Sequence, residues 1–169
     1  MVDLPQAGTR SKLHSVARHS LAILLATTAL GVVSAHAVDG TWTGAGSEWT
    51  DGTNWSSTPT VPDGIATFTN TGPTTVQSSG LVNIGSVQFT AAPNAQAYTI
   101  TTNDIFLVNG TGVFNNSTNT QTFNVNFSVV FQNSSTASGG SNPVTYNNNG
   151  AISFTNRAAP SSPMPPLVS

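Results

Sequence analysis

The stretch Phe123-Asn-Val-Asn-Phe-Ser-Val-Val-Phe131 decides the fold class. Its large apolar residues recur at every second position and are separated mostly by small polar ones, a period that predicts a half-buried β-strand. β-branched Thr and Val fill many other positions of the chain, which also favours strands. Apolar residues at helical spacing are sustained nowhere outside residues 21–33. The sequence therefore predicts an all-β protein in which 123–131 forms one strand.

Five segments share a template of an aliphatic residue, any residue, a large apolar residue, any residue and then usually Asn. They are Ala66-Thr-Phe-Thr-Asn70, Val87-Gln-Phe-Thr-Ala91, Ile105-Phe-Leu-Val-Asn109, Val129-Val-Phe-Gln-Asn133 and Ile152-Ser-Phe-Thr-Asn156. Their last residues lie 21, 18, 24 and 23 positions apart. A strand that recurs at such an interval is typical of a solenoid, whose coils stack on one another. Asn suits the strand ends because it tolerates the left-handed backbone of a turn, and it could stack on its equivalents in successive coils.

We therefore expect a right-handed parallel β-helix. The alternative is an antiparallel β-sandwich, which also shows short strands at regular spacing. Two observations favour the β-helix: the residues repeat as well as the spacing, and the repeat region has few of the charges that mark a solvated sandwich face.

The N-terminal region has the three parts of a secretory signal peptide. A basic segment precedes the uncharged, mostly apolar run 21–33, and Ser34-Ala-His-Ala37 then supplies the small residues that signal peptidase reads. The apolar run is shorter than the roughly 20 residues needed to cross a bilayer, which argues against a membrane helix. We expect residues 1–37 to be the signal peptide, cleavage to fall between Ala37 and Val38, and the mature chain to have no membrane span.

The chain beyond residue 37 is acidic and has little chemistry to offer. It holds five acids against one base, a formal charge of −4, and it has no Lys, His or Cys; the charged residues are Asp39, Glu48, Asp51, Asp63, Asp104 and Arg157. With no basic patch, we expect no nucleic-acid partner. The absence of Cys excludes disulfides and thiolate zinc sites, and the absence of His excludes a Ser-His-Asp relay.

Three acids near the start of the mature chain are candidates for a site. Glu48 and Asp51, with Asp63, could form a carboxylate pair for glycoside hydrolysis or ligate calcium, but their spacing matches neither a calcium loop nor a cleft with two placed carboxyls. Acids in Gly-rich loops are usually solvated turn residues. We expect no catalytic residue, no metal and no cofactor, and hence no enzyme.

Trp42, Trp49 and Trp55 lie close together in the sequence and are the three tryptophans of the chain. They could form a platform on which a sugar stacks, which would make the chain a small secreted carbohydrate-binding module. Alternatively, they could cap the open end of the first coil, since solenoids need capping units at their ends. We favour the cap.

Several segments resemble the start of autotransporter passenger domains with autotransporter-associated β-strand repeats. They are Asp39-Gly-Thr-Trp-Thr-Gly-Ala-Gly-Ser-Glu-Trp-Thr-Asp-Gly-Thr-Asn-Trp55, Val61-Pro-Asp-Gly-Ile-Ala-Thr-Phe68, Ile84-Gly-Ser-Val-Gln-Phe89, Tyr98-Thr-Ile-Thr101 and Gly110-Thr-Gly-Val-Phe-Asn115. The resemblance covers about residues 38–156. One departure is that the acid directly follows Pro62. Such passengers are exported to the periplasm and carried to the cell surface by a C-terminal membrane barrel, and many are adhesins.

We expect a cap region at 38–65 and β-helix repeats at 66–156. Four prolines in 157–169 cannot continue a β ladder, so we expect this segment to be a disordered Pro-rich tail. The resemblance implies an adhesin-type surface module located in the periplasm, at the cell surface or outside the cell. The partner would be a host-surface or extracellular carbohydrate or protein. We expect a truncated passenger, because the 169 residues leave no room for the translocator barrel.

Overall fold

The computed structural model describes residues 36–155. The expected Pro-rich tail lies outside this range, as does the expected signal peptide apart from its last two residues. The described part is built of strands, and its one helix is the short 3-10 turn η1 (Gly52–Asn54). None of its helices is long and apolar enough to cross a membrane. The all-β prediction is confirmed.

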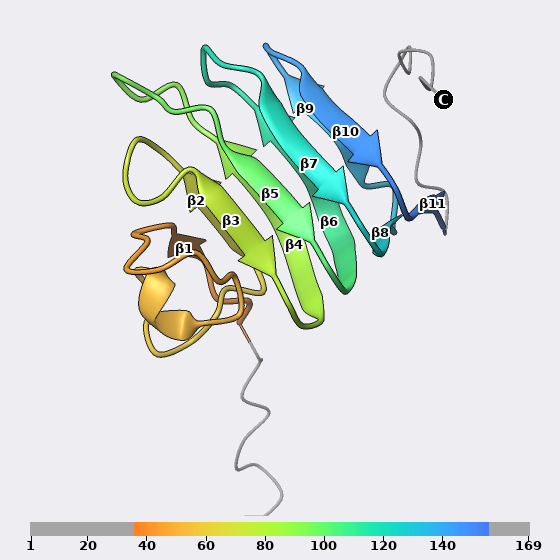
Figure 1. The fold of residues 1–169 in the computed structure, drawn as a ribbon, viewed down its shortest axis with the longest axis horizontal. Coiled ribbons are helices and arrows are strands. Elements are labelled where there is room, and N and C mark those ends of the chain that lie inside the picture. Colours follow the sequence, from red (N-terminus) through yellow and green to blue (C-terminus); the bar gives the residue numbers. More distant parts are fainter. Residues whose placement is uncertain (1–35, 156–169) are drawn as a thin grey trace, which may run out of the picture. The chain divides into compact units, whose positions relative to one another are not determined.

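The strands form two sheets, and Figure 1 shows the sheet of β3, β5, β7 and β10 in front of the other. The larger has the order β1-β2-β4-β6-β8-β11, with β9 also paired to β6, and the smaller has the order β10-β7-β5-β3. The bounds are β1 (Gly40–Thr41), β2 (Ile65–Phe68), β3 (Thr75–Ser78), β4 (Val82–Phe89), β5 (Thr99–Thr102), β6 (Ile105–Asn115), β7 (Gln121–Val125), β8 (Ser128–Phe131), β9 (Thr136–Gly140), β10 (Val144–Asn148) and β11 (Ala151–Phe154).

Every pair of named strands is parallel, and each strand pairs with its counterpart about one coil away in the chain. About five coils stack in this way. The molecule is a parallel β-helix, and the antiparallel sandwich is excluded. Because the hydrogen bonds run between coils, each coil satisfies the backbone of the next.

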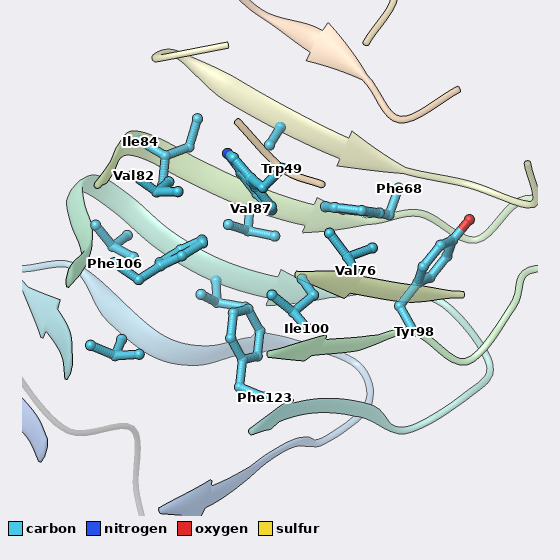
Figure 2. Packing of buried hydrophobic residues seen from close by; sticks show 14 of the residues in the cluster. Trp49, Phe68, Val76, Val82, Ile84, Val87, Tyr98, Ile100, Phe106 and Phe123 are labelled. Carbon is cyan, nitrogen blue, oxygen red and sulfur yellow. The ribbon is translucent and has the colours of Figure 1, made fainter. Parts of the chain in front are cut away.

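The interior is made of columns in which one residue from each coil stacks on its equivalent. One column is Val76, Ile100, Phe123 and Tyr146, and another is Ile84, Val108, Phe131 and Phe154. Figure 2 shows the first members of these columns pointing into the same interior, together with Trp49 and Phe68. Most of these side chains are fully buried. Removal of this apolar surface from water is the main favourable contribution to folding.

Glycines allow neighbouring coils to approach where β4 and β6 change direction. The register between these two strands shifts between Ile84 and Ser86. A side chain on Gly85 would meet the carbonyl oxygen of Gly64 at 2.7 Å, and one on Gly110 would meet that of Gly85 at 2.5 Å. A Cβ does not fit at such distances, so Gly85 and Gly110, which stack on each other and on Gly64, must be glycine.

The prediction of one strand over 123–131 is wrong. The segment forms β7 and β8, and the chain turns a corner between them at Asn126 and Phe127. Phe123, Val125, Val129 and Phe131 point inward as expected, but Phe127 lies at the corner and is 54% exposed. Alternation survives on both sides of the corner, which is why the sequence pattern does not reveal it.

The five sequence copies are not all equivalent in the stack. The first two stack on each other, with Ala66 beside Val87, and the last two stack with Val129 beside Ile152. These pairs belong to different segments of the coil. Ile105 begins the third copy but faces outward, because it is Phe106 that stacks on Val129. The five copies share a strand pattern, but they do not all occupy the same position in the coil. The alignment of the first two copies with the last two is therefore wrong.

Asn residues do stack between coils. The Asn109 side-chain amide donates to Oδ1 of Asn83 at 2.6 Å, and the Asn133 amide donates to the carbonyl oxygen of Asn109 at 3.0 Å. Asn133 also has the left-handed backbone expected of a strand end, with φ of 53°. Asn70 and Asn109 do not have positive φ. Their role is therefore hydrogen bonding between coils rather than turn formation.

One interior column carries hydroxyl groups without partners. Ser78 stacks on Thr102, which stacks on Val125, and all three are fully buried. The hydroxyl oxygens of Ser78 and Thr102 have no hydrogen-bond partner within the described structure. A buried polar group without a partner is destabilising, because it has lost its hydrogen bonds to water.

Thr102→Val should therefore stabilise the protein. The substitution keeps the shape of the side chain, removes the unpaired hydroxyl and matches Val125 in the next coil. We expect the free energy of unfolding to rise by about 1 kcal/mol in urea denaturation. The control is Thr101→Val, which changes the neighbouring, outward-facing residue and should have little effect. A loss of stability in Thr102→Val would contradict the assignment of this hydroxyl to the dry interior.

Candidate functional site

The three tryptophans form one buried cluster over the first coil. The rings of Trp42 and Trp49 pack against Trp55 edge to face, with centroid distances of 5.0 and 4.8 Å. All three also contact Phe68, at 5.6 to 5.8 Å. Their side chains are no more than 1% exposed. In this packing no indole presents a free face on which a sugar could stack, whereas a cap over the core uses all three.

Hydrogen bonds tie this cluster to the backbone. The indole nitrogen of Trp55 donates to the carbonyl oxygen of Trp49 at 2.8 Å, and that of Trp42 donates to the carbonyl oxygen of Pro73 at 3.2 Å. Buried Asn54 donates to the carbonyl oxygen of Glu48 at 2.7 Å and accepts from the Gly46 amide. Asn54 thus holds together the two sides of the loop that carries the tryptophans. Sequence reasoning missed it, since nothing distinguishes it from the many exposed Asn residues.

The segment 38–64 covers the first strands of both sheets. On the larger sheet, β1 pairs with β2. On the smaller sheet, the Trp49 amide donates to the carbonyl oxygen of Gln77 in β3 at 2.7 Å, and the Gln77 amide donates to Ser47 at 2.8 Å. Both sheet edges at this end of the stack are therefore paired, which protects them from other strands. We call this segment the N-terminal cap.

The structure gives each candidate acid a local hydrogen-bonding role. The Glu48 carboxylate accepts from the Ser79 amide at 2.9 Å, from the Ser79 hydroxyl at 2.7 Å and from the Thr50 hydroxyl at 3.0 Å. Burial raises the pKa of Glu48, but these hydrogen bonds lower it more, so that it lies below its ordinary value. Glu48 links the cap to the turn after β3.

Asp51 and Asp63 have similar structural roles. Asp51 is the N-cap of η1, and hydrogen bonds from the hydroxyl and amide of Thr53 lower its pKa. Asp63 accepts from the Val38 amide at 2.6 Å. Within residues 36–155, no three His, Asp or Glu side chains gather in a way that could hold a metal ion.

The outer face of the smaller sheet carries two polar columns, which we call the polar face. One column is Thr75, Thr99, Thr122 and Thr145, and the other is Gln77, Thr101, Asn124 and Asn147. The Asn147 amide donates to Oδ1 of Asn124 at 2.9 Å. Sequence reasoning missed this face because it followed apolar positions. A search for polar residues that recur with the coil would have found the Thr column, whose members lie 24, 23 and 23 residues apart.

The exposed large apolar side chains of the described residues lie at one corner of successive coils. They are Leu81, Ile105 and Phe127, with exposures of 62, 39 and 54%. Each follows the smaller-sheet strand of its coil and precedes or begins the next strand. We call them the corner ridge. Exposed apolar patches are common at interaction sites, and three residues make a small patch.

No protein-family model, curated protein or solved structure matches the chain. The geometry described above is therefore the basis for a functional assignment.

Trp55→Ala should destabilise the fold. Loss of this fully buried ring leaves a cavity between Trp42, Trp49 and Phe68, and we expect the free energy of unfolding to fall by about 3–5 kcal/mol. The control is Thr43→Ala, an exposed position in the same segment, which should leave stability unchanged. Chemical denaturation gives both values. If Trp55→Ala kept its stability but lost binding to a glycan array, the cluster would be a sugar platform rather than a cap.

Proposed function

We propose that the chain is an exported, non-enzymatic β-helix that acts as an adhesive surface module of the autotransporter-passenger kind. The polar face is the single observation that carries this proposal. Its hydroxyl and amide groups lie in straight columns on a continuous parallel sheet, and they do not converge on one point as the groups of an active site do. Such a surface suits broad, shallow contact with an extended partner.

The partner class follows from the chemistry of this face. Its eight residues carry no charge, and all of them are hydrogen-bond donors or acceptors. Uncharged surfaces of this kind bind through hydrogen bonds and bridging water. A carbohydrate or protein on a host cell or in the extracellular matrix offers matching groups. Neither a metal nor a cofactor is part of the proposed mechanism.

The start of the fold supports export with cleavage after Ala37. His36 and Ala37 are exposed, whereas the backbone of Val38 is fixed on both sides. Its amide donates to Asp63, and its carbonyl oxygen accepts from the amides of Asp63 and Gly64 at 3.1 and 2.9 Å. Cleavage there would leave an α-ammonium group beside the Asp63 carboxylate. The new terminus would thus gain an ion pair instead of losing a hydrogen bond.

The first part of the test is export. The full chain, produced with its own leader in a Gram-negative bacterium, should appear outside the cytoplasm with Val38 as its first residue by mass spectrometry. Ala37→Leu should block cleavage, because signal peptidase requires a small residue there. Retention of the intact chain in the cytoplasm would contradict the proposal.

The second part is adhesion by the exported chain to surfaces coated with extracellular-matrix protein or with glycans. The double variant Thr101→Lys/Asn124→Lys alters neighbouring positions on the polar face and should weaken binding by about tenfold, because the lysines must be desolvated at the contact. The matched control is Thr67→Lys/Gln88→Lys, two neighbouring outward positions on the larger sheet. Equal loss in both variants, or binding by neither the parent nor the control, would contradict the assignment.

A further inference from the structure

The outward groups of the polar face repeat in two directions. Each of its four strands has Thr at one outward position and an uncharged polar residue two positions later: Gln77 in β3, Thr101 in β5, Asn124 in β7 and Asn147 in β10. Alternate residues of a parallel strand lie about 6.6 Å apart, and neighbouring strands lie about 4.8 Å apart. The strands lie side by side in Figure 1, and their pairings show no register shift. The face is therefore a two-dimensional array with two fixed spacings.

Most polar side-chain groups of this array are not used within the protein. Among the described residues, the one hydrogen bond between its side chains joins Asn147 to Asn124. Outward amides of the larger sheet are engaged more fully, since Asn109 donates to Asn83 and its carbonyl oxygen accepts from Asn133. The Thr hydroxyls of the polar face can therefore bond to a ligand outside the protein, and each carries a methyl group beside the hydroxyl.

The eight residues of the array include neither a charged nor an aromatic side chain. A charged group costs far more to remove from water than a hydroxyl or an amide does. The charged residue in register with the array is Glu48 of the N-terminal cap, which pairs with Gln77, and its carboxylate accepts hydrogen bonds from Ser79 and Thr50. The array also offers no ring on which the sugars of a crystalline polysaccharide could stack. Its chemistry suits a ligand that is itself an ordered array of uncharged hydrogen-bonding groups.

We propose that the polar face binds ice. Water molecules in ice occupy positions that repeat in two directions at short, fixed spacings of the same order as those of the array. Hydroxyl and amide groups held on a hydrogen-bonded sheet can keep water in such positions, and all eight residues meet the same crystal surface at once, so that weak contacts add up. This ligand goes beyond the proposed adhesion, because it uses the same face but requires neither export nor a macromolecular partner.

The test is the partition of the full chain between ice and liquid while a buffer without other macromolecules freezes slowly. We expect the chain to be enriched in the ice, and single ice crystals in its solution to freeze below their melting temperature. Thr101→Tyr places a ring in the middle of the array and should abolish both effects, because the ring holds the neighbouring rows away from the crystal. The matched control is Thr67→Tyr, an outward position on the larger sheet, which should keep both effects.

Circular dichroism should show that the variants are folded, and Asn124→Tyr provides a second change within the same array. Exclusion of the parent chain from the ice would overturn the inference, and so would equal loss of enrichment in Thr67→Tyr. Binding to crystalline cellulose without enrichment in ice would assign the face to a polysaccharide instead. Adhesion to matrix protein or glycans without enrichment in ice would leave the proposed function standing and overturn ice binding alone.

Discussion

The register between the strands of neighbouring coils is the constraint on which the structure depends. The hydrogen bonds of each strand run to the coils before and after it, so a coil has no stable backbone pairing by itself. The register also decides what each side chain contacts, since inward-facing residues stack on the residues in register with them in the next coil. Columns such as Ile84, Val108, Phe131 and Phe154 result. The Asn stacks and the glycine column of Gly64, Gly85 and Gly110 are further consequences of the same registration.

A stack of this kind has an end that must be covered, and the described residues show how the first coil is covered. The N-terminal cap uses three tryptophans and a short loop held by Asn54 to cover the core and pair both sheets. The last described coil is bare, with apolar rings that are half covered and strands that are half paired.

Much of the fold could be predicted from the sequence, because inward and outward positions alternate regularly. That alternation indicated the all-β class, and the recurring strand template indicated the coil repeat. Corners were harder to place. Phe127 has the spacing of a core residue but lies at a turn, because alternation continues in phase on both sides of Asn126 and Phe127. Ile105 also lies at a corner, so its place as the first residue of the third copy gave a wrong alignment of that copy with the others. The polar face could not be found from apolar periodicity, since its signal is the recurrence of Thr at the length of a coil.

The most direct test of the account is whether residues one coil apart are neighbours. The chain has no cysteine, so introduced pairs report without interference. Thr99 and Thr122 are in register on β5 and β7, at the separation that a disulfide spans. We predict that Thr99→Cys/Thr122→Cys forms an intrachain disulfide under mild oxidation, and that the off-register pair Thr99→Cys/Asn124→Cys does not. Efficient cross-linking of the second pair, or of neither, would contradict the stacked register.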